Sequence, residues 1–259
     1  GYNTMYSNTE GNQNAAYGEA ALFSNTTGNF NTAFGRNALF SNTIGKSNVA
    51  QGQGALFNTV SGNQNVSIGN GSGYSNVSGS SNVFIGRQAG YSETGSNKLY
   101  IANFKTTPLI YGEFSNTPAD NKLAIGLNSV TAGRVLDVHN GAYLSTGGVW
   151  TNASSRELKQ DIQLLSNEDA QQTLAALSPV RYAYKNSPDE EYVGFIAEDV
   201  PELVASNDRK SLSPMDVVAV LTQVTKEQES QLAEKDVEVA ALKDRMLQLE
   251  LALTELLRE

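Results

Sequence analysis

The chain has 259 residues, no cysteine, one histidine and a net charge of −9, from 27 acidic and 18 basic side chains. The lack of cysteine excludes disulfides and thiolate metal sites, and the lack of clustered Lys and Arg argues against a nucleic-acid partner. No apolar run approaches the roughly 18 residues of a membrane helix, so we expect no membrane insertion. Composition changes so sharply along the chain that we expect several segments instead of one core.

The first segment, residues 1–103, is rich in Gly, Asn, Ser and Thr and contains a 17-residue repeat. Each unit has an Asn at its fourth position, then a short alternating stretch, a glycine turn and a second apolar patch. This order is typical of a β-solenoid or β-roll, in which neighbouring coils stack into one core. Residues 1–10 resemble the end of an earlier unit, so we expect the shaft to continue upstream. The complete units begin at Gly11, Gly28, Gly45, Gly62 and Gly79.

The fourth-position asparagines have two interpretations. They could line a sugar-binding face, or they could stack into hydrogen-bonded ladders that satisfy backbone groups at the corners, and we expect ladders. Calcium is disfavoured because calcium-binding repeats use Asp where these units have Asn, and we expect no metal or cofactor. The asparagines are Asn14, Asn31, Asn48, Asn65 and Asn82.

The stretches "NVSIG" and "NVFIG" are similar to the head repeats of trimeric autotransporter adhesins and to repeats of bacterial and phage fibres. Alternating segments continue after the repeats, so residues 104–153 are expected to form a distal β tip or linker. His139, Tyr143 and Trp150 could bind a cell-surface glycan or receptor there. Packing of these rings in a core or an interface is the simpler expectation.

From Ser154 onward the pattern becomes that of a small α+β domain. "NEDAQQTLAAL" predicts a helix with an Asn cap and acidic residues in its first turn. "VRYAYK" predicts a strand, and "YVGFIAEDV" predicts a strand running into a helix start. Residues 154–259 hold 11 basic and 21 acidic side chains, so the net negative charge of the chain lies there.

Residues 215–259 contain neither Gly nor Pro, and their apolar residues follow a heptad frame. Some 40 residues at about 1.5 Å each form a rod too long for so small a domain to cover, so self-association is expected. Thr225, Gln228 and Lys235 interrupt the frame and are expected to set register and oligomer state. The predicted apolar core positions are Val218, Leu221, Leu232, Val239, Leu242, Met246, Leu249, Leu253 and Leu256.

The stretch "NASSRELKQDI", residues 152–162, carries the candidate chemistry. A serine becomes a nucleophile only with a base, and the sole histidine, His139, lies in the preceding segment, so a histidine-based triad is unsupported. A lysine can act as the base where burial or positive neighbours lower its pKa from about 10.4. For Ser155 and Lys159, at helical spacing, an ordinary cap and an exposed charge are the simpler expectation.

The stretches "SSRELKQDI", "LSPVRYAYK" and "VGFIAEDVPELV", followed by the heptads, closely resemble the peptidase family S74 domain, the C-terminal intramolecular chaperone of endosialidase-type tailspikes and many fibres. The family pattern of Ser, Asp, any residue, Arg, Leu and Lys maps the nucleophile to Ser154 and the base to Lys159. The resemblance implies self-cleavage between Ala153 and Ser154, a homotrimer, and an active site formed on assembly. Ser155 stands where the family usually has Asp, and Glu157 where it often has Arg, so both are expected to modulate cleavage.

Together these patterns predict a mainly β fibre with a repetitive, trimeric shaft, followed by a small α+β domain that ends in a long trimeric coiled coil. We expect the distal part of an extracellular adhesion fibre, on a bacterial surface or as a phage tail fibre. Two alternatives stay open: a structural fibre with a degenerate, uncleaved trimerisation clamp, and a glycan-binding adhesin. The predicted segments are the shaft (1–103), the tip (104–153), the chaperone and autoprotease domain (154–214) and the coiled coil (215–259).

Overall fold

The computed structural model describes residues 1–256, with side chains to residue 254, and forms two compact units, Gly1–Lys159 and Gln160–Glu259. The first unit contains a single 11-stranded sheet whose strands follow one another in chain order. The second contains a two-stranded sheet and two α-helices.

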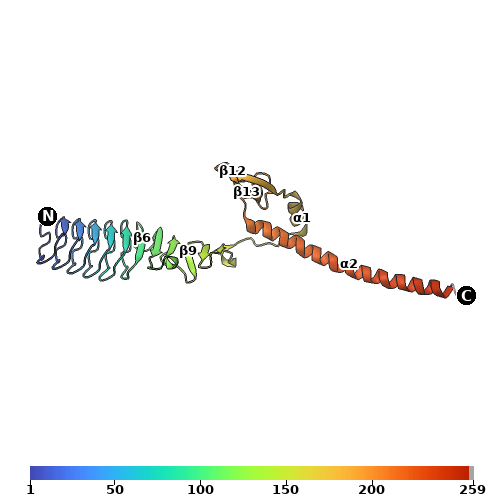
Figure 1. Ribbon diagram of the computed structural model, residues 1–259, viewed down its shortest axis with the longest axis horizontal. Coiled ribbons are helices and arrows are strands. Elements are labelled where there is room, and N and C mark those ends of the chain that lie inside the picture. The colour runs from blue at the N-terminus through green and yellow to red at the C-terminus, as the bar shows by residue number, and fades with distance from the viewer. Residues whose placement is uncertain (257–259) are drawn as a thin grey trace. The chain divides into compact units, whose positions relative to one another are not determined.

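The repeats fold as a β-solenoid, as their sequence predicted. Each of the first five strands is three residues long, and each pairs in parallel with the strand of the next repeat. Backbone hydrogen bonds join residues in neighbouring coils, and Figure 1 shows these coils stacked one against the next. The strands are β1 (Ala15–Tyr17), β2 (Thr32–Phe34), β3 (Val49–Gln51), β4 (Val66–Ile68) and β5 (Val83–Ile85).

The core of the solenoid is filled mainly by buried leucines and by Phe84. The middle residue of each strand points inward because side chains alternate along a strand, and this residue is small in the early coils. In the coil of β5 the pattern reverses, because Phe84 points inward and Gly90 replaces the leucine. The coil of β4 has small residues at both positions, Ser67 and Gly73, and the Phe84 ring reaches toward Gly73. An added Cβ would lie 2.6 Å from the Phe84 ring at Gly73 and 2.2 Å at Gly90. The leucines of the earlier coils are Leu22, Leu39 and Leu56, all fully buried.

The expected asparagine ladder is present along the solenoid. Asn65 is fully buried, and its backbone N–H donates to Oδ1 of Asn48 at 3.0 Å. Its side-chain Nδ2 donates to the carbonyl oxygen of Gly79 at 2.9 Å, and its Oδ1 accepts the backbone N–H of Asn82 at 3.0 Å. Each asparagine therefore satisfies backbone groups of its own and neighbouring coils, which is the structural interpretation of the repeat.

After β5 the repeat ends, but the same sheet continues. β5 still pairs in parallel with β6, and β6, β7 and β8 then pair in antiparallel fashion. β8 pairs in parallel with β9, and β9, β10 and β11 close the sheet in antiparallel fashion. The alternating segments predicted after residue 99 are therefore strands. They are β6 (Lys98–Ile101), β7 (Ile110–Glu113), β8 (Lys122–Ile125), β9 (Arg134–Val138), β10 (Tyr143–Ser145) and β11 (Trp150–Thr151), with a 3₁₀ turn at Pro118–Asp120 between β7 and β8.

In the second unit, helix α1 (Asn167–Ala176) is followed by the hairpin of β12 (Val180–Tyr184) and β13 (Ser187–Gly194). The helix was predicted, but its cap is Ser166 instead of an asparagine: the Ser166 hydroxyl accepts the N–H of Asp169. The acidic first turn is as expected. The helix start predicted after β13 is wrong, since the chain there forms turns up to α2.

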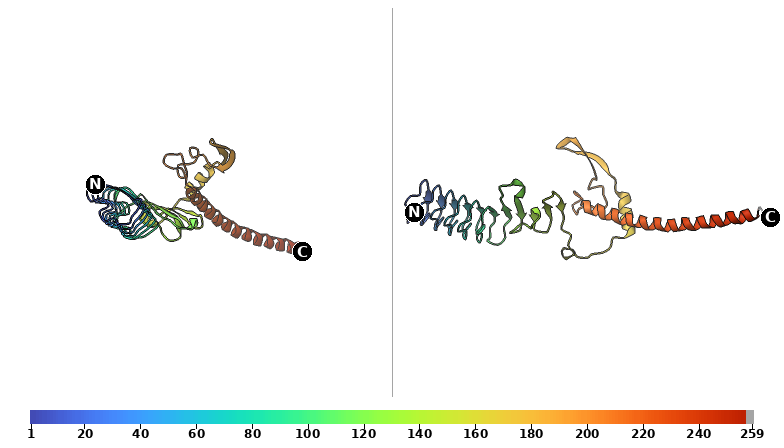
Figure 2. Two further views of the ribbon diagram at one scale, coloured as in Figure 1. Left: turned by 60° about the vertical axis from the view of Figure 1, so that its left-hand side comes forward. Right: turned by 60° about the horizontal axis from the view of Figure 1, so that its bottom comes forward.

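Helix α2 (Pro214–Leu256) has 43 residues and begins inside the second unit. Val220 and Val224 are buried there against Ala170 of α1 and against Val200 and Val204 of the preceding turns. Both figures of the whole chain show α2 continuing well past α1 as a single rod (Figures 1 and 2). From residue 228 to residue 254 every residue is exposed. The small domain thus covers only the start of the helix.

Candidate active site

The candidate dyad lies just after β11, around a short 3₁₀ turn at Arg156–Leu158. The Ser155 hydroxyl caps the start of this turn, and the backbone N–H of Lys159 donates to the carbonyl oxygen of Arg156 at 3.2 Å at its end. Ser154 is next to the cap in the chain, and the turn reverses direction after it. As a result, Nζ of Lys159 lies 2.8 Å from Oγ of Ser154. The two predicted catalytic side chains are in direct contact.

The second serine has a different environment. Oγ of Ser155 accepts the backbone N–H of Glu157 at 3.3 Å, which is an N-terminal capping contact. The turn therefore brings Ser154, and not Ser155, to the amine of Lys159. Glu157 contributes its backbone to this cap. Helical spacing had favoured Ser155 as the partner of Lys159, whereas in the structure Ser155 caps the turn and Ser154 contacts the amine.

The dyad is open to solvent in the single chain. Ala153, Ser154 and Lys159 are all exposed, and in the described part of the chain Lys159 makes no ion pair. Ala153, which carries the carbonyl that would be attacked, approaches the tip: an added Cβ at Gly141 would lie 3.3 Å from the Cβ of Ala153. The arrangement supplies a nucleophile next to an amine, but no burial.

The three aromatic candidates of the tip contact their own neighbours. The Arg134 guanidinium lies 3.9 Å from the centre of the Tyr143 ring, a cation–π contact. The indole N–H of Trp150 donates to Oδ1 of Asn152 at 2.9 Å. His139 is exposed, and its backbone N–H joins it to β8. Local packing accounts for Tyr143, in agreement with the simpler expectation, and the contacts do not bring the three rings into one site.

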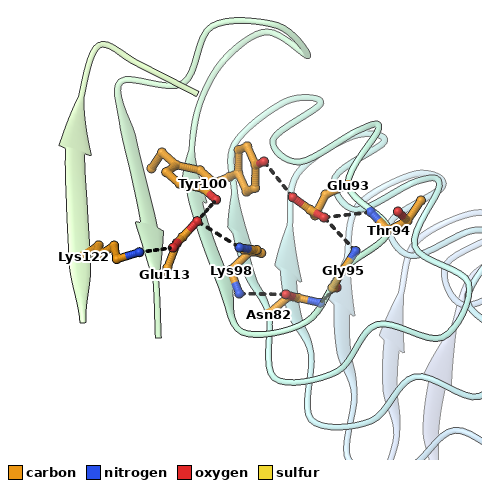
Figure 3. Close-up of polar contacts among 9 residues, drawn as sticks. Asn82, Glu93, Thr94, Gly95, Lys98, Tyr100, Glu113 and Lys122 are labelled. Carbon is orange, nitrogen blue, oxygen red and sulfur yellow. Dashed lines mark hydrogen bonds and ion pairs between the residues drawn. The ribbon is translucent and has the colours of Figure 1, made fainter. Parts of the chain in front are cut away.

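Sequence reasoning missed a polar cluster where the solenoid passes into the antiparallel strands (Figure 3). Oε1 of Glu113 accepts hydrogen bonds from the Tyr111 hydroxyl at 2.8 Å and from Nζ of Lys98 at 3.1 Å, and Nζ of Lys122 donates to Oε2 at 3.3 Å. Burial alone would raise the pKa of Glu113, but these hydrogen bonds and the nearby ammonium groups lower it overall. The carboxylate is therefore held charged and fully partnered, which suits a structural joint.

The second carboxylate of the cluster, Glu93, holds the end of the last coil by hydrogen bonds. Oε2 of Glu93 accepts the Tyr100 hydroxyl at 2.8 Å, and Oε1 accepts the backbone N–H groups of Thr94 and Gly95. Burial, together with this bond to a carboxylate, raises the pKa of Tyr100. Composition alone could have drawn attention to Glu93, because it is one of very few carboxylates in the repeat segment. Nothing in the spacing showed that Tyr100 would reach it.

The predicted coiled-coil stripe on α2 is exposed along its described length. Thr225, Gln228 and Lys235, the polar interruptions, are exposed as well. Leu256 lies outside the residues whose side chains are described. The exposed fractions are 48% for Val218, 43% for Leu221, 61% for Leu232, 46% for Val239, 52% for Leu242, 61% for Met246, 64% for Leu249 and 60% for Leu253.

Two further properties concern ligands and membranes. Within residues 1–256, no group of three or more His, Cys, Asp or Glu side chains is placed to hold a metal ion. No helix in that part of the chain is both long and apolar enough to cross a membrane.

Comparison with known proteins gives one match. Residues 154–208 match the family model Peptidase_S74, described as the chaperone of endosialidase. Neither a search of curated proteins nor a search of solved structures finds a match to this chain. The matched region begins at Ser154 and includes Lys159, α1 and the β12–β13 hairpin. Residues 154–208 thus match the peptidase S74 family, as their motifs had indicated.

Proposed function

We propose that this chain is part of a trimeric extracellular fibre whose C-terminal region assembles the trimer and then cuts itself off between Ala153 and Ser154. The observation that carries the cleavage is the 2.8 Å contact between Oγ of Ser154 and Nζ of Lys159. A serine hydroxyl beside an amine is the minimum arrangement for a nucleophile and its base. The peptidase family match at the same residues supports this assignment.

The reaction needs only groups of this chain and one water. Lys159, as the free amine, takes the proton from Oγ of Ser154 while Oγ bonds to the carbonyl carbon of Ala153. The peptide C–N bond then breaks, and the departing α-amine of Ser154 receives the proton from Lys159. The product is an ester between Ala153 and the Ser154 side chain. Water hydrolyses this ester, giving a carboxylate at Ala153 and restoring the hydroxyl.

Cleavage is expected to wait for assembly. A lysine becomes a base near neutral pH only after burial or positive neighbours lower its pKa. Lys159 is exposed in the single chain, so other chains must supply its cover. In this scheme a misassembled or monomeric chain keeps its chaperone, and only a completed trimer loses it.

The exposed apolar surfaces support association. The stripe of α2 residues from Val218 to Leu253 has no partner within the described chain, and a heptad stripe of this kind is buried in a coiled coil. Four of the five residues that end strands β1 to β5 are apolar and face outward: Tyr17, Phe34, Ile68 and Ile85 are between 38% and 67% exposed. An early coiled coil would align such shafts before they pack, which matters because pairing between chains is slow and prone to aggregation.

The proposal also includes the location of the fibre and its role in adhesion. A stack of coils with few charges, followed by a β-structured tip, suits a shaft that presents a binding surface away from its point of attachment. We place the protein on a bacterial surface or on a phage tail, where it would adhere to a glycan or receptor of a host or prey cell.

The intact masses of purified variants test the cleavage. The unsubstituted chain should yield fragments 1–153 and 154–259, whereas Ser154→Ala and Lys159→Ala should stay full length. Ser155→Ala is the matched control: losing the cap should slow cleavage but not abolish it, because Ser155 does not contact Lys159. If all chains stay full length, the domain is an uncleaved trimerisation clamp. Cleavage in both Ser154→Ala and Lys159→Ala would exclude the dyad.

A further inference from the structure

One corner of the solenoid carries a groove of about 320 Å³ that crosses the coils between residues 37 and 91. Aromatic rings form part of its lining, and amide side chains form another part. No charged residue lines it. The amide side chains of the lining are Asn37, Gln53, Asn70 and Gln88, and the rings are Phe57, Tyr74 and Tyr91.

The groove exists because two coils lack a side chain at one repeat position. Asn37, Gly54, Gly71 and Gln88 occupy this position in successive repeats, and all four have a positive φ, from 58° to 64°. The backbone there does not require glycine, since Asn37 and Gln88 adopt the same conformation. A Cβ added at Gly54 would lie 3.8 Å from the Tyr74 ring, in ordinary contact. A side chain would therefore fit at the glycines, and its absence leaves a gap two coils long.

One side of the gap is a stack of half-buried rings. Phe57 and Tyr74 are 5.0 Å apart between ring centres, and Tyr74 and Tyr91 are 4.9 Å apart, nearly parallel in both cases. Nζ of Lys105 lies 5.8 Å from the centre of the Tyr91 ring, at the end of the stack. Because the ring faces cover one another, a ligand would meet ring edges, which carry partial positive charge and attract oxygen atoms.

Amide groups supply the polar contacts. Nδ2 of Asn70 donates to Oε1 of Gln53 at 3.4 Å, and Asn70 and Gln53 are both exposed. Among the described residues, the side chains of Asn37 and Gln88 at the two ends of the gap make no hydrogen bond to protein. Each amide offers both donors and an acceptor, so it can pair with a hydroxyl in either sense. A phosphorylated or sulfated ligand would need Lys or Arg in the lining, which is uncharged.

We infer that this groove binds a neutral glycan, with one or two sugar rings lying between Asn37 and Gln88. Neighbouring strands are about 4.8 Å apart, so the two-coil gap is about 10 Å long and sets the length of the bound segment. This inference gives the proposed adhesion a site and a ligand class, and it is independent of the proposed cleavage.

The test uses the full chain on a printed array of neutral hexose and N-acetylhexosamine oligosaccharides, with sialylated and sulfated oligosaccharides alongside. Gly71→Asn should fill the gap and abolish the neutral-glycan signal without unfolding the coil, since Asn37 already occupies the equivalent position. Asn70→Ala should weaken binding about fivefold, as expected for one lost hydrogen bond. The matched control is Ser81→Gln, which enlarges a side chain at another positive-φ corner, where Gln64 shows that glutamine is accepted. Melting temperatures establish that each variant is folded.

The outcomes separate the groove from adhesion in general. Neutral-glycan binding that is lost in Gly71→Asn and kept in Ser81→Gln supports the site. Binding that survives in Gly71→Asn overturns the groove but leaves adhesion in place. Binding of sulfated or sialylated glycans alone overturns the ligand class, and a chain that binds no glycan overturns both the groove and glycan adhesion. The intact mass of the same samples reports on cleavage separately.

Discussion

The solenoid and the long helix α2 use apolar residues in opposite ways. In the solenoid the stacked coils bury leucines and Phe84, and ladder asparagines such as Asn65 are hydrogen-bonded within the same chain. In α2 the described heptad positions beyond Leu221 stay exposed in the single chain. A periodic β stack therefore makes its own core, because each coil is the partner of the next. A helix with a heptad stripe can make one only with other helices, so its stability is a property of the assembly.

The largest expected effect comes from substitutions on the heptad stripe of α2. Replacing Leu242 and Leu249 together by Asp puts charges into the predicted coiled-coil core, and the proposed trimer should dissociate to monomers at micromolar concentration. Each lost leucine should cost about 2 kcal/mol or more per chain, before the cost of burying an unpaired charge is added. Sedimentation equilibrium measures the change in mass.

The matched control places the same charges off the stripe. Val237 and Leu247 are 72% and 56% exposed and occupy outer heptad positions, so Val237→Asp with Leu247→Asp should leave the trimer intact. Equal dissociation of both double variants would mean that general charge, and not the stripe, decides association. A trimer that persists in the Leu242 and Leu249 variant would place the assembly surface elsewhere.

A somewhat smaller effect is expected from substitutions in the core of the solenoid. Phe84→Ala should destabilise the shaft by about 3–5 kcal/mol, because it empties a fully buried site. Gly73→Leu alone should also destabilise it, since an added Cβ would clash with the Phe84 ring. Combining Phe84→Ala with Gly73→Leu removes the clash and places a leucine in the same coil as the small Ser67, as in the earlier coils, so it should recover part of the loss. Thermal unfolding followed by circular dichroism measures all three variants.

The control for the shaft is Phe104→Ala, because Phe104 is 60% exposed and should contribute little. The shaft effects should also persist in the chain that carries Leu242→Asp and Leu249→Asp, if the core of the solenoid belongs to the single chain. If the shaft lost stability when the chains dissociate but not in Phe84→Ala, its stability would depend on the assembly and not on its own core.

The repeat was the most predictable part of the fold, because a fixed period forces every coil into the same conformation. A ladder of asparagines and the exchange of leucine for glycine opposite Phe84 are both visible in the aligned units. The second unit was less predictable because its local signals compete. Ser166 and Asn167 are both good caps one residue apart, and only the structure separates them. After β13, Pro201 disfavours helix at the residue before it, and Val200 and Val204 pack under α2 from turns.

The site was predictable only in part. Family resemblance, and not helical spacing, indicated Ser154, because a serine outside a capped 3₁₀ turn reaches Lys159 at a separation of five residues. The joint at Glu113 could not be predicted, since its partners come from β6 and β8 and meet only once the antiparallel strands form. Short-range patterns reveal caps and periods, whereas contacts between distant strands depend on the completed sheet.

The smallest expected effect concerns Glu113, whose charged carboxylate, and not apolar packing, is expected to stabilise this part of the first unit. The pKa of Glu113 is lower in the folded chain than its ordinary 4.5. The carboxylate therefore contributes stability that is fully present above about pH 4.5 and is lost as the pH falls through the lowered folded value. Glu113→Gln should lower the free energy of unfolding at pH 7 by about 1 kcal/mol, and it should lose less than the unsubstituted chain between pH 5 and pH 3.

Denaturant unfolding of both chains at pH 7, 5 and 3 measures this difference, with Asp120→Asn as the control because Asp120 is exposed. Asp137 also has a lowered pKa: burial would raise it, but hydrogen bonds from Thr131 and Arg134 outweigh burial. Some acid sensitivity must therefore remain in Glu113→Gln. If that variant and the unsubstituted chain lost stability in parallel from pH 5 to pH 3, Glu113 would not be a stabilising charge. The stability of the first unit would then come from the packing of its coils alone, whereas the stability of α2 would still depend on other helices.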